Sequence, residues 1–238
     1  MTIVIPTRNN PSDLAVLLMQ LQQQREKPKA VFIADNSVDG SGFEIAKRYH
    51  FDKDVPFAIQ RNVGNIHKSW NTGIDFAGDD DVALLNDDCL ISWDFVDNFS
   101  AYARSGGAEM YCPDNSGFPP TQRVREGYEW YSKSELSYRL LDHQEYELPP
   151  SLTGWCMVIP HTTIQKVGTF DEQFKLYFGD KDYEARIFNS KGRIAFISGL
   201  NVQHYGSSST FKIEPKKIDK YYKHDEARYK EKYEISKN

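Results

Sequence analysis

The sequence predicts an α/β fold built on a single, mostly parallel sheet with helices on its faces. Short apolar runs alternate with amphipathic segments through the first half of the chain, and polar residues follow the apolar runs. This alternation is typical of doubly wound sheets, which bind their ligands at the carboxyl ends of the strands. A chain of 238 residues fits one domain of this kind better than two.

The elements of the first half follow from hydrophobic periodicity and from helix-start residues. The predicted strands are residues 2–6, 30–34, 57–60 and 82–85. Residues 10–12 (NPS) supply the start of the first predicted helix, and three further helices are predicted at 43–49, 64–76 and 93–103. The first helix carries one apolar face formed by Leu14, Leu17, Leu18 and Leu21.

The second half is less regular. Residues 115–150 are polar and aromatic, and we interpret them as a partly helical excursion over one edge of the sheet. After this segment, hydrophobic periodicity again predicts regular elements: a strand at 155–159, a helix at 179–189 and a strand at 193–197. Residues 215–236 alternate Lys, Glu and Tyr, which predicts a terminal helix with a solvated face.

The composition of the chain limits the classes of partner and the cellular compartment that we expect. With 34 acidic and 29 basic residues the net charge is −5, which disfavours nucleic acid as a partner and suits a divalent cation. The sparse cysteines, Cys89, Cys112 and Cys156, form neither a disulfide framework nor a zinc motif, so we expect a cytoplasmic location. No run is apolar enough to span a bilayer; peripheral membrane association through the Lys/Tyr-rich terminus stays open.

An acidic triplet, residues 86–88 (NDD), follows the apolar run 82–85 directly. Adjacent carboxylates at the end of a buried strand repel one another and lose hydration, and a divalent cation bound with a diphosphate offsets that cost. The alternative is a solvated turn, because Asp and Asn are common turn residues. A second acidic string at 79–81 precedes the strand, so we assign it to a solvated loop at the opposite end.

Taken together, six segments resemble the inverting family 2 glycosyltransferases, which have the GT-A fold. They are residues 2–9 (TIVIPTRN), 34–41 (ADNSVDGS), 61–65 (RNVGN) with 71–74 (NTGI), 84–88 (LLNDD), 168–172 (GTFDE) and 178–186 (FGDKDYEAR). The similarity spans about residues 1–90 and 150–206, and the order and spacing of the segments make it specific. It implies one domain over residues 1–238, with a nucleotide-sugar half at 1–112 and an acceptor and catalytic-base half at 113–238.

The resemblance implies a set of donor-binding residues. Pro6, Thr7 and Arg8 would line the nucleotide pocket, Asp35 would accept a hydrogen bond from the base, and Arg61 or Asn62 would lie beside the base or ribose. Asn86 would contact the ribose or sugar, and Asp88 would bind Mn²⁺ or Mg²⁺. Asn86 stands where the family has a carboxylate, which weakens the metal site unless Asp87 shares the task.

The resemblance also places the catalytic base near residue 180. An inverting transfer needs a carboxylate that takes the proton of the acceptor hydroxyl. Asp180 aligns with the family's base, although Gly179 replaces the Glu that normally precedes it, and Asp182 is the alternative base or an acceptor-binding residue. Acids that merely satisfy a helix N-terminus would look the same. His204, after a late strand, either completes the metal shell or is structural.

Acceptor contacts are expected from Gly154 and Trp155, which lie where the family places acceptor and donor-sugar contacts. Further aromatic residues either stack on sugar rings or pack the excursion against the sheet; they are Tyr128, Trp130, Tyr131, Tyr138 and Tyr146.

The expected function is transfer of a sugar, with UDP the favoured nucleotide, to a hydroxyl on a glycan, a lipid-linked sugar or a protein. A nucleotidyltransferase is an alternative, but residues 6–14 hold no Gly-rich phosphate loop. A dinucleotide-dependent dehydrogenase lacks its fingerprint for the same reason. A non-catalytic sugar-nucleotide or glycan-binding module stays open because of Asn86 and Gly179.

Overall fold

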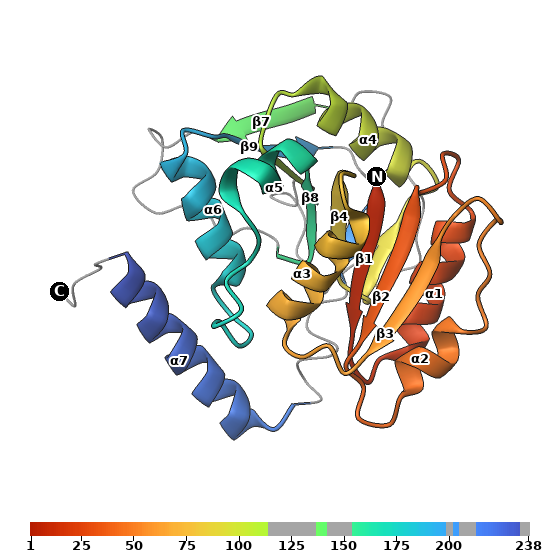
Figure 1. Ribbon diagram of the computed structural model, residues 1–238, viewed down its shortest axis with the longest axis horizontal. Helices are drawn as coiled ribbons and strands as arrows, with labels where there is room; N and C mark the ends of the chain where they lie inside the picture. The colour runs from red at the N-terminus through yellow and green to blue at the C-terminus, as the bar shows by residue number, and fades with distance from the viewer. Residues whose placement is uncertain (114–136, 142–153, 199–201, 205–212, 234–238) are drawn as a thin grey trace.

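A computed structural model describes residues 1–113, 137–141, 154–198, 202–204 and 213–233 of the chain. Its centre is an eight-stranded sheet with the strand order β3-β2-β1-β4-β8-β6-β9-β7 (Figure 1). The predicted α/β class with one central sheet is confirmed.

One half of the sheet is parallel. It consists of β1 (Thr2–Thr7), β2 (Ala30–Asp35), β3 (Phe57–Arg61) and β4 (Val82–Leu85). The predicted apolar runs thus became strands within one or two residues of their expected ends. Since these strands run in the same direction, their carboxyl ends meet at one edge, where Thr7 lies beside Asp35 and Asp35 beside Arg61.

The other half of the sheet is mixed. It contains β6 (Met110–Pro113), β7 (Ser137–Leu141), β8 (Cys156–Ile159) and β9 (Ile194–Ser198). β8 runs antiparallel to both β4 and β6, and β7 runs antiparallel to β9 at the outer edge. Because β8 is reversed, its first residues, rather than its last, meet the carboxyl end of β4, with Cys156 opposite Leu85.

Helices cover both faces of the sheet (Figure 1). One face packs against α1 (Pro11–Gln22), α2 (Ser41–Ala46) and α4 (Phe95–Ser105), and the other against α3 (Ile66–Ala77), α5 (His161–Val167) and α6 (Gly179–Asn189). Successive strand side chains point to opposite faces, so Ile3 and Ile5 join one apolar cluster while Val4 joins the other. Gly73 lets α3 lie directly on Val4, since a Cβ there would collide with the valine side chain.

Two further elements lie outside these layers. A two-stranded antiparallel ribbon joins β5 (Cys89–Ile91) to β10 (Val202–His204), and neither strand was expected from the sequence. The terminal helix α7 (Pro215–Lys232) lies diagonally below α6 and the loop that precedes it (Figure 1).

The acidic string 79–81 precedes β4 and lies at the opposite end of the sheet from residues 86–88, as expected. Asp79 is fully exposed, Asp80 pairs with Lys29, and Asp81 accepts the backbone N–H of His161 at 2.9 Å. Within the excursion, only residues 137–141 belong to the described part of the chain, so the side chains of Tyr128, Trp130, Tyr131, Tyr138 and Tyr146 lie outside the described residues. Across the described ranges, no helix is long and apolar enough to cross a membrane.

Candidate active site

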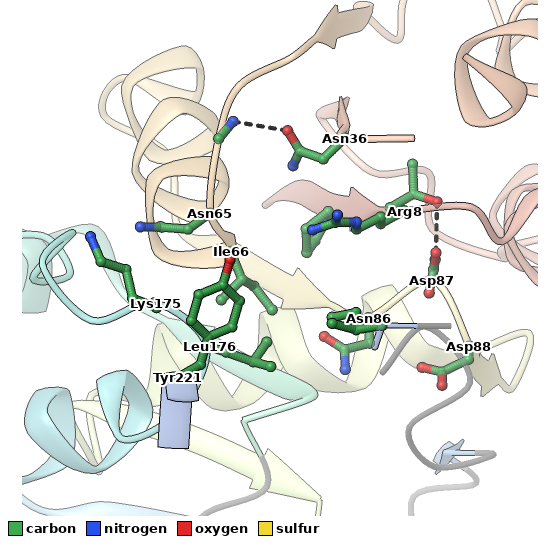
Figure 2. Close-up of a pocket in the computed structure, with 14 residues that line it drawn as sticks. Arg8, Asn36, Asn65, Ile66, Asn86, Asp87, Asp88, Lys175, Leu176 and Tyr221 are labelled. Atoms are coloured by element: carbon green, nitrogen blue, oxygen red, sulfur yellow. Dashed lines mark hydrogen bonds between the residues drawn. The ribbon is translucent and has the colours of Figure 1, made fainter. Parts of the chain in front are cut away.

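A cavity opens at the carboxyl edge of the parallel strands (Figure 2). Residues from the loops after β1, β2, β3 and β4 form one side of it, and residues from far later in the sequence form the other. The lining residues are Pro6, Thr7, Arg8, Asn36, Gly64, Asn65, Ile66, Asn86, Asp87, Asp88, Lys175, Leu176, Ile213 and Tyr221. Six of them, Pro6 to Arg8 and Asn86 to Asp88, are residues that the sequence singled out.

Asp87 ties the loop after β4 to the loop after β1. The Thr7 hydroxyl donates a hydrogen bond of 2.6 Å to one carboxylate oxygen, and the Asn10 amide donates one of 3.2 Å to the other (Figure 2 draws the first). Burial raises the pKa of Asp87 to about 7, although the hydrogen bonds from Thr7 and Asn10 act in the opposite direction. Asp87 therefore shapes the cavity wall chiefly by fixing two loops.

Asp88 faces His204. The imidazole Nε2 lies 2.9 Å from the Asp88 carboxylate and 3.4 Å from the Asn86 side-chain amide. The pairing of β10 with β5 brings them together, because it places His204 opposite Cys89, the residue after Asp88. The ring of Trp155 stacks on the imidazole, with centroids 5.0 Å apart and planes 5° apart, and the Trp155 carbonyl accepts the Asn86 N–H at 2.9 Å.

These residues fit a divalent cation that takes only a few of its ligands from the protein. Asp88 offers a carboxylate oxygen and His204 an imidazole nitrogen, and these two atoms lie 2.9 Å apart beside the Asn86 amide. In the described part of the chain, no group of three or more His, Cys, Asp or Glu side chains has the geometry of a metal site. The remaining ligands of a cation at Asp88 and His204 would have to be phosphate oxygens or water, which is the coordination that Mg²⁺ commonly has in proteins.

The three other predicted donor residues are not among those that line the cavity: Asp35 is buried, and Arg61 and Asn62 are exposed. The buried Asp35 carboxylate accepts the backbone N–H groups of Ser37 and Phe43, each at 2.9 Å, so it shapes the loop after β2. The Arg61 side chain lies 3.9 Å from Asp35 and covers the Phe43 ring.

Asn36, next to Asp35, is the residue of this loop that reaches the cavity. Its amide oxygen accepts the Gly64 N–H at 2.8 Å, and its amide nitrogen donates to the Ser69 hydroxyl at 2.8 Å. Asn36 therefore links the loop after β2 to the start of α3. Nothing in the sequence separates Asn36 from Asp35, because only the direction of the side chain distinguishes them.

Asp180 lies at the start of α6 and against Gly154. A Cβ on Gly154 would lie 2.5 Å from a carboxylate oxygen of Asp180, so a larger residue at position 154 would require the Asp180 side chain to move. Burial raises the pKa of Asp180, and the hydrogen bond from the Lys181 N–H opposes that rise. The two predicted residues, one expected as base and one expected as an acceptor contact, are thus neighbours.

Asp182 has a different environment. It is fully buried, its carboxylate lies 3.1 Å from the Arg186 guanidinium and 2.6 Å from the Lys232 ammonium, and it accepts the Tyr233 hydroxyl at 2.9 Å. Its oxygens are directed at the last residues of α7 and at its own helix. The geometry therefore gives Asp182 a structural role in joining α6 to α7 and leaves Asp180 as the acid beside the predicted acceptor residues.

His67, for which the sequence suggested no role, fills the space beside Gly179. A Cβ on Gly179 would overlap the imidazole, and His67 Nδ1 lies 3.0 Å from the Phe174 carbonyl. Burial lowers the pKa of His67, which favours a neutral ring. Because a carbonyl only accepts hydrogen bonds, Nδ1 carries the proton and Nε2 faces Gly179.

The far wall of the cavity comes from residues that sequence reasoning missed. Lys175 and Leu176 precede α6, Ile213 precedes α7, and Tyr221 lies on α7, where its ring is close to Ile66 and Leu176 (Figure 2). A signal was present in the spacing of Tyr221, Asp225 and Tyr229, which recur every four residues and so share one face of the helix.

Asp88 and Asp180 belong to one rim of the molecule. Asp88 contacts His204, His204 stacks on Trp155, and Trp155 follows Gly154, which contacts Asp180. The cavity itself is lined by Asp88 and not by Asp180. The cavity that Asp88 lines is thus linked to the carboxylate of Asp180 by a short continuous chain of contacts.

The fold is that of the GT-A glycosyltransferases. The solved structure of S. aureus TarS superposes with a TM-score of 0.62 at 17% sequence identity, covering 83% of this chain and 35% of that chain. A structure of TarS 1–349 in complex with UDP-GlcNAc gives a TM-score of 0.61 at 16% identity, covering 82% of this chain and 55% of that chain. This chain therefore spans between about a third and about a half of the TarS chains that it matches.

The sequence profile of the family described as glycosyl transferase family 2 matches residues 2–168, which is more than half of the chain. The chain belongs to this family and is a glycosyltransferase. A curated relative is the N-acetylglucosaminyl-diphospho-decaprenol L-rhamnosyltransferase of Mycobacterium tuberculosis, which is 25% identical over 88% of this chain and 78% of the relative.

Proposed function

We propose that this chain is an inverting glycosyltransferase that moves a sugar from a nucleoside-diphosphate donor to an acceptor hydroxyl. One observation carries the proposal. The contact chain from Asp88 through His204, Trp155 and Gly154 to Asp180 links the proposed cation and diphosphate site to a half-buried carboxylate. An inverting displacement needs both groups on one side of the molecule.

The donor would occupy the cavity at the strand ends. Thr7 and Arg8 line one side of it, and Asn36 and Asn65 supply polar groups from the neighbouring loops. We favour a uridine nucleotide, because solved TarS structures of this fold are described as complexes with UDP and with UDP-GlcNAc. The rhamnosyltransferase relative makes a rhamnosyl donor the second choice.

Asp88 and His204 would hold Mn²⁺ or Mg²⁺, and Asn86 would lie beside the cation and the donor ribose or sugar. When bound, the cation supplies positive charge that stabilises the diphosphate as it leaves. Arg8, which lines the same cavity, adds a fixed positive charge to the site.

Asp180 would act as the general base. As the acceptor oxygen forms its bond to the anomeric carbon, the bond from that carbon to the diphosphate oxygen breaks, and the hydroxyl proton passes to the Asp180 carboxylate. Burial raises the pKa of this carboxyl, and a higher pKa makes a carboxylate a better proton acceptor.

The acceptor would approach over Gly154 and Trp155. We infer a hydroxyl on a glycan or on a lipid-linked sugar, because the relative from M. tuberculosis is named for a diphospho-decaprenol acceptor. The Trp155 ring already stacks on His204, so its contribution to acceptor binding would be coupled to the orientation of that imidazole.

A thermal-shift screen followed by a donor-consumption assay tests this proposal. UDP, dTDP and GDP are each added with and without Mn²⁺, since a ligand that binds the native state raises its stability. UDP-GlcNAc and dTDP-rhamnose are then tested for release of free sugar.

We expect a shift with UDP, enhanced by Mn²⁺, and slow release of sugar from one donor. The result that counts against the enzyme and for a non-catalytic module, an alternative that Asn86 favours, is binding of a nucleotide with no release of sugar from any donor, with or without acceptor sugars. The absence of binding by all three nucleotides would remove the donor site itself.

A further inference from the structure

We propose that Asp225 of α7 is a positioning residue of the active site, which holds the loop 174–178 so that the far wall of the cavity and Asp180 keep their places. This inference rests on the proposed function for the meaning of Asp180. It goes beyond the family match, which ends at residue 168, and assigns a role in the reaction to the helix formed by residues 215–232.

Asp225 binds a run of backbone amides. Its carboxylate is fully buried and accepts the N–H groups of Lys175, Leu176 and Tyr177 at 2.8, 2.8 and 2.9 Å. The His224 imidazole lies 2.8 Å from one of its oxygens. Three successive N–H groups directed at one carboxylate form an anion-binding turn, and the anion here is a side chain from a helix about 50 residues later.

The loop held in this way leads to both parts of the site. Lys175 and Leu176 line the cavity, and Asp180 follows two residues after Phe178, which adopts a positive φ of 64°. A left-handed conformation is unfavourable for a bulky residue and persists only where the surroundings enforce it. Asp225 is therefore part of what enforces the turn from the loop into α6.

The opposite side of the loop is held by α3. The carbonyl of Phe174 accepts the Asn65 amide at 3.1 Å and the His67 Nδ1–H at 3.0 Å. The loop thus lies between two sets of hydrogen bonds, one from α3 to its carbonyl and one from Asp225 to its amides. Loss of the Asp225 set leaves three N–H groups without their acceptor and frees the loop on the side of α7.

Asp225 differs from the other attachments of α7. Asp171 accepts the Arg228 guanidinium at 2.6 Å and the Lys232 ammonium at 3.3 Å, so it also secures α7. Asp171 accepts the Gln173 N–H at 3.0 Å, whereas the amides at 175–177 bind Asp225. Asp171→Asn is therefore a matched control, because it makes the same chemical change and weakens the docking of the same helix.

The test compares Asp225→Asn, Asp225→Ala and Asp171→Asn in the full chain. Asn offers one acceptor oxygen and an NH₂ group that cannot accept the remaining amides, so it should act as a partial replacement. Amide hydrogen exchange at 175–177, UDP affinity from thermal shifts, and the rate of donor hydrolysis are measured for each. If Asp225→Ala does not fold, Asp225→Asn decides alone.

We expect exchange at 175–177 to accelerate about tenfold or more in Asp225→Asn and not in Asp171→Asn, since an amide exchanges when its hydrogen bond opens. Hydrolysis should fall about tenfold in Asp225→Asn and about a hundredfold in Asp225→Ala, because small misplacements of a catalytic group have effects of this size. UDP affinity should fall by a smaller factor than hydrolysis, since Lys175 and Leu176 lose support while the walls at 6–8 and 86–88 are untouched.

Equal losses of hydrolysis in Asp225→Asn and Asp171→Asn at equal loss of stability would overturn the inference, since Asp225 would then only attach α7. Unchanged exchange at 175–177 in Asp225→Asn would also overturn it. Failure of the wild-type chain to bind any nucleoside diphosphate is a separate result: it removes the proposed function, while the exchange data still decide whether Asp225 holds the loop.

Discussion

The imidazole of His67 occupies the space into which any side chain of residue 179 would project. The pair accounts for a departure from the family pattern, since the resemblance leads one to expect Glu where this chain has Gly179. The space beside residue 179 is filled by a neutral ring that hydrogen-bonds the loop before α6. Asp180 is consequently positioned without the acidic neighbour that the family places beside it.

Gly179→Ala should destabilise the fold. Adding His67→Ala to that variant should restore part of the lost stability. The added methyl group overlaps the imidazole, and overpacking of a buried site costs about 1–3 kcal/mol. In the double variant the methyl group enters the space that the ring has left, so the double variant should be more stable than the sum of the single changes indicates. Urea unfolding of the four proteins measures this coupling. Strict additivity would mean that the two residues do not compete for space.

Asp180→Asn should keep the fold and UDP binding and lose transfer by about 10²–10⁴-fold, which is the usual contribution of a general base. Asp182→Asn should instead cause a marked loss of stability, because this buried carboxylate faces Arg186, Lys232 and Tyr233. Donor-consumption rates and thermal midpoints of both variants separate the two roles. Turnover at the wild-type rate in Asp180→Asn would exclude Asp180 as the base.

Asn86→Asp should strengthen Mn²⁺ binding. It adds a carboxylate beside Asp88 and His204, since the Asn86 amide lies 3.4 Å from the imidazole. Asp88→Asn should weaken Mn²⁺ binding, because it removes the carboxylate that faces His204 at 2.9 Å. Calorimetric titration of Mn²⁺ into each protein with saturating UDP gives the affinities, and we expect the order Asn86→Asp, wild type, Asp88→Asn from tightest to weakest. An identical affinity in all three would place the cation elsewhere or nowhere.

Glu184→Gln should flatten the dependence of stability on pH. Glu184 is fully buried, its oxygens have no hydrogen-bond partner among the described residues, and burial together with the charge of Asp180 raises its pKa to about 9. The folded protein therefore keeps a proton that the unfolded chain loses near pH 4.5. Stability contributed by this group is complete below that pH and falls as pH rises towards 9.

The variant cannot ionise at position 184, so thermal midpoints between pH 5 and about pH 9 should fall less in Glu184→Gln than in the wild type. Asp87, whose pKa is raised to about 7, lowers stability in the same way over a narrower pH range. That decline is common to both proteins and cancels when their curves are compared. Parallel curves for the two proteins would show that Glu184 is ionised in the folded state.

Much of the sheet could be predicted from hydrophobic patterning, because fully buried parallel strands appear as uninterrupted apolar runs. The strand at 82–85 and the helix at 179–189 were predicted with the bounds that the structure has. The three-residue strands of the ribbon were not, since each is too short to show a period and exists only through pairing across more than 100 residues. The contact between the His204 and Asp88 side chains depends on that pairing, which sets His204 opposite Cys89, so the sequence suggested a metal role for His204 only by resemblance.

The donor residues divide in a similar way. Residues at the ends of β1 and β4 reach the cavity as expected, because the carboxyl ends of parallel strands meet at one edge. Asp35 does not reach it, because its carboxylate is directed into its own loop, while the next residue, Asn36, faces the opening. The direction of a side chain in a loop depends on local hydrogen bonds, which hydrophobic periodicity in the sequence does not predict.

The hydrogen bonds from the amides at 175–177 to Asp225 also affect the order of folding during biosynthesis. Chains emerge from the ribosome with the N-terminal end first, and domains tend to fold in that order. Asp225 is translated about 50 residues after the amides that it binds, so those amides lack this acceptor until α7 has emerged. The far wall of the cavity can therefore reach its final arrangement only late in the synthesis of the chain.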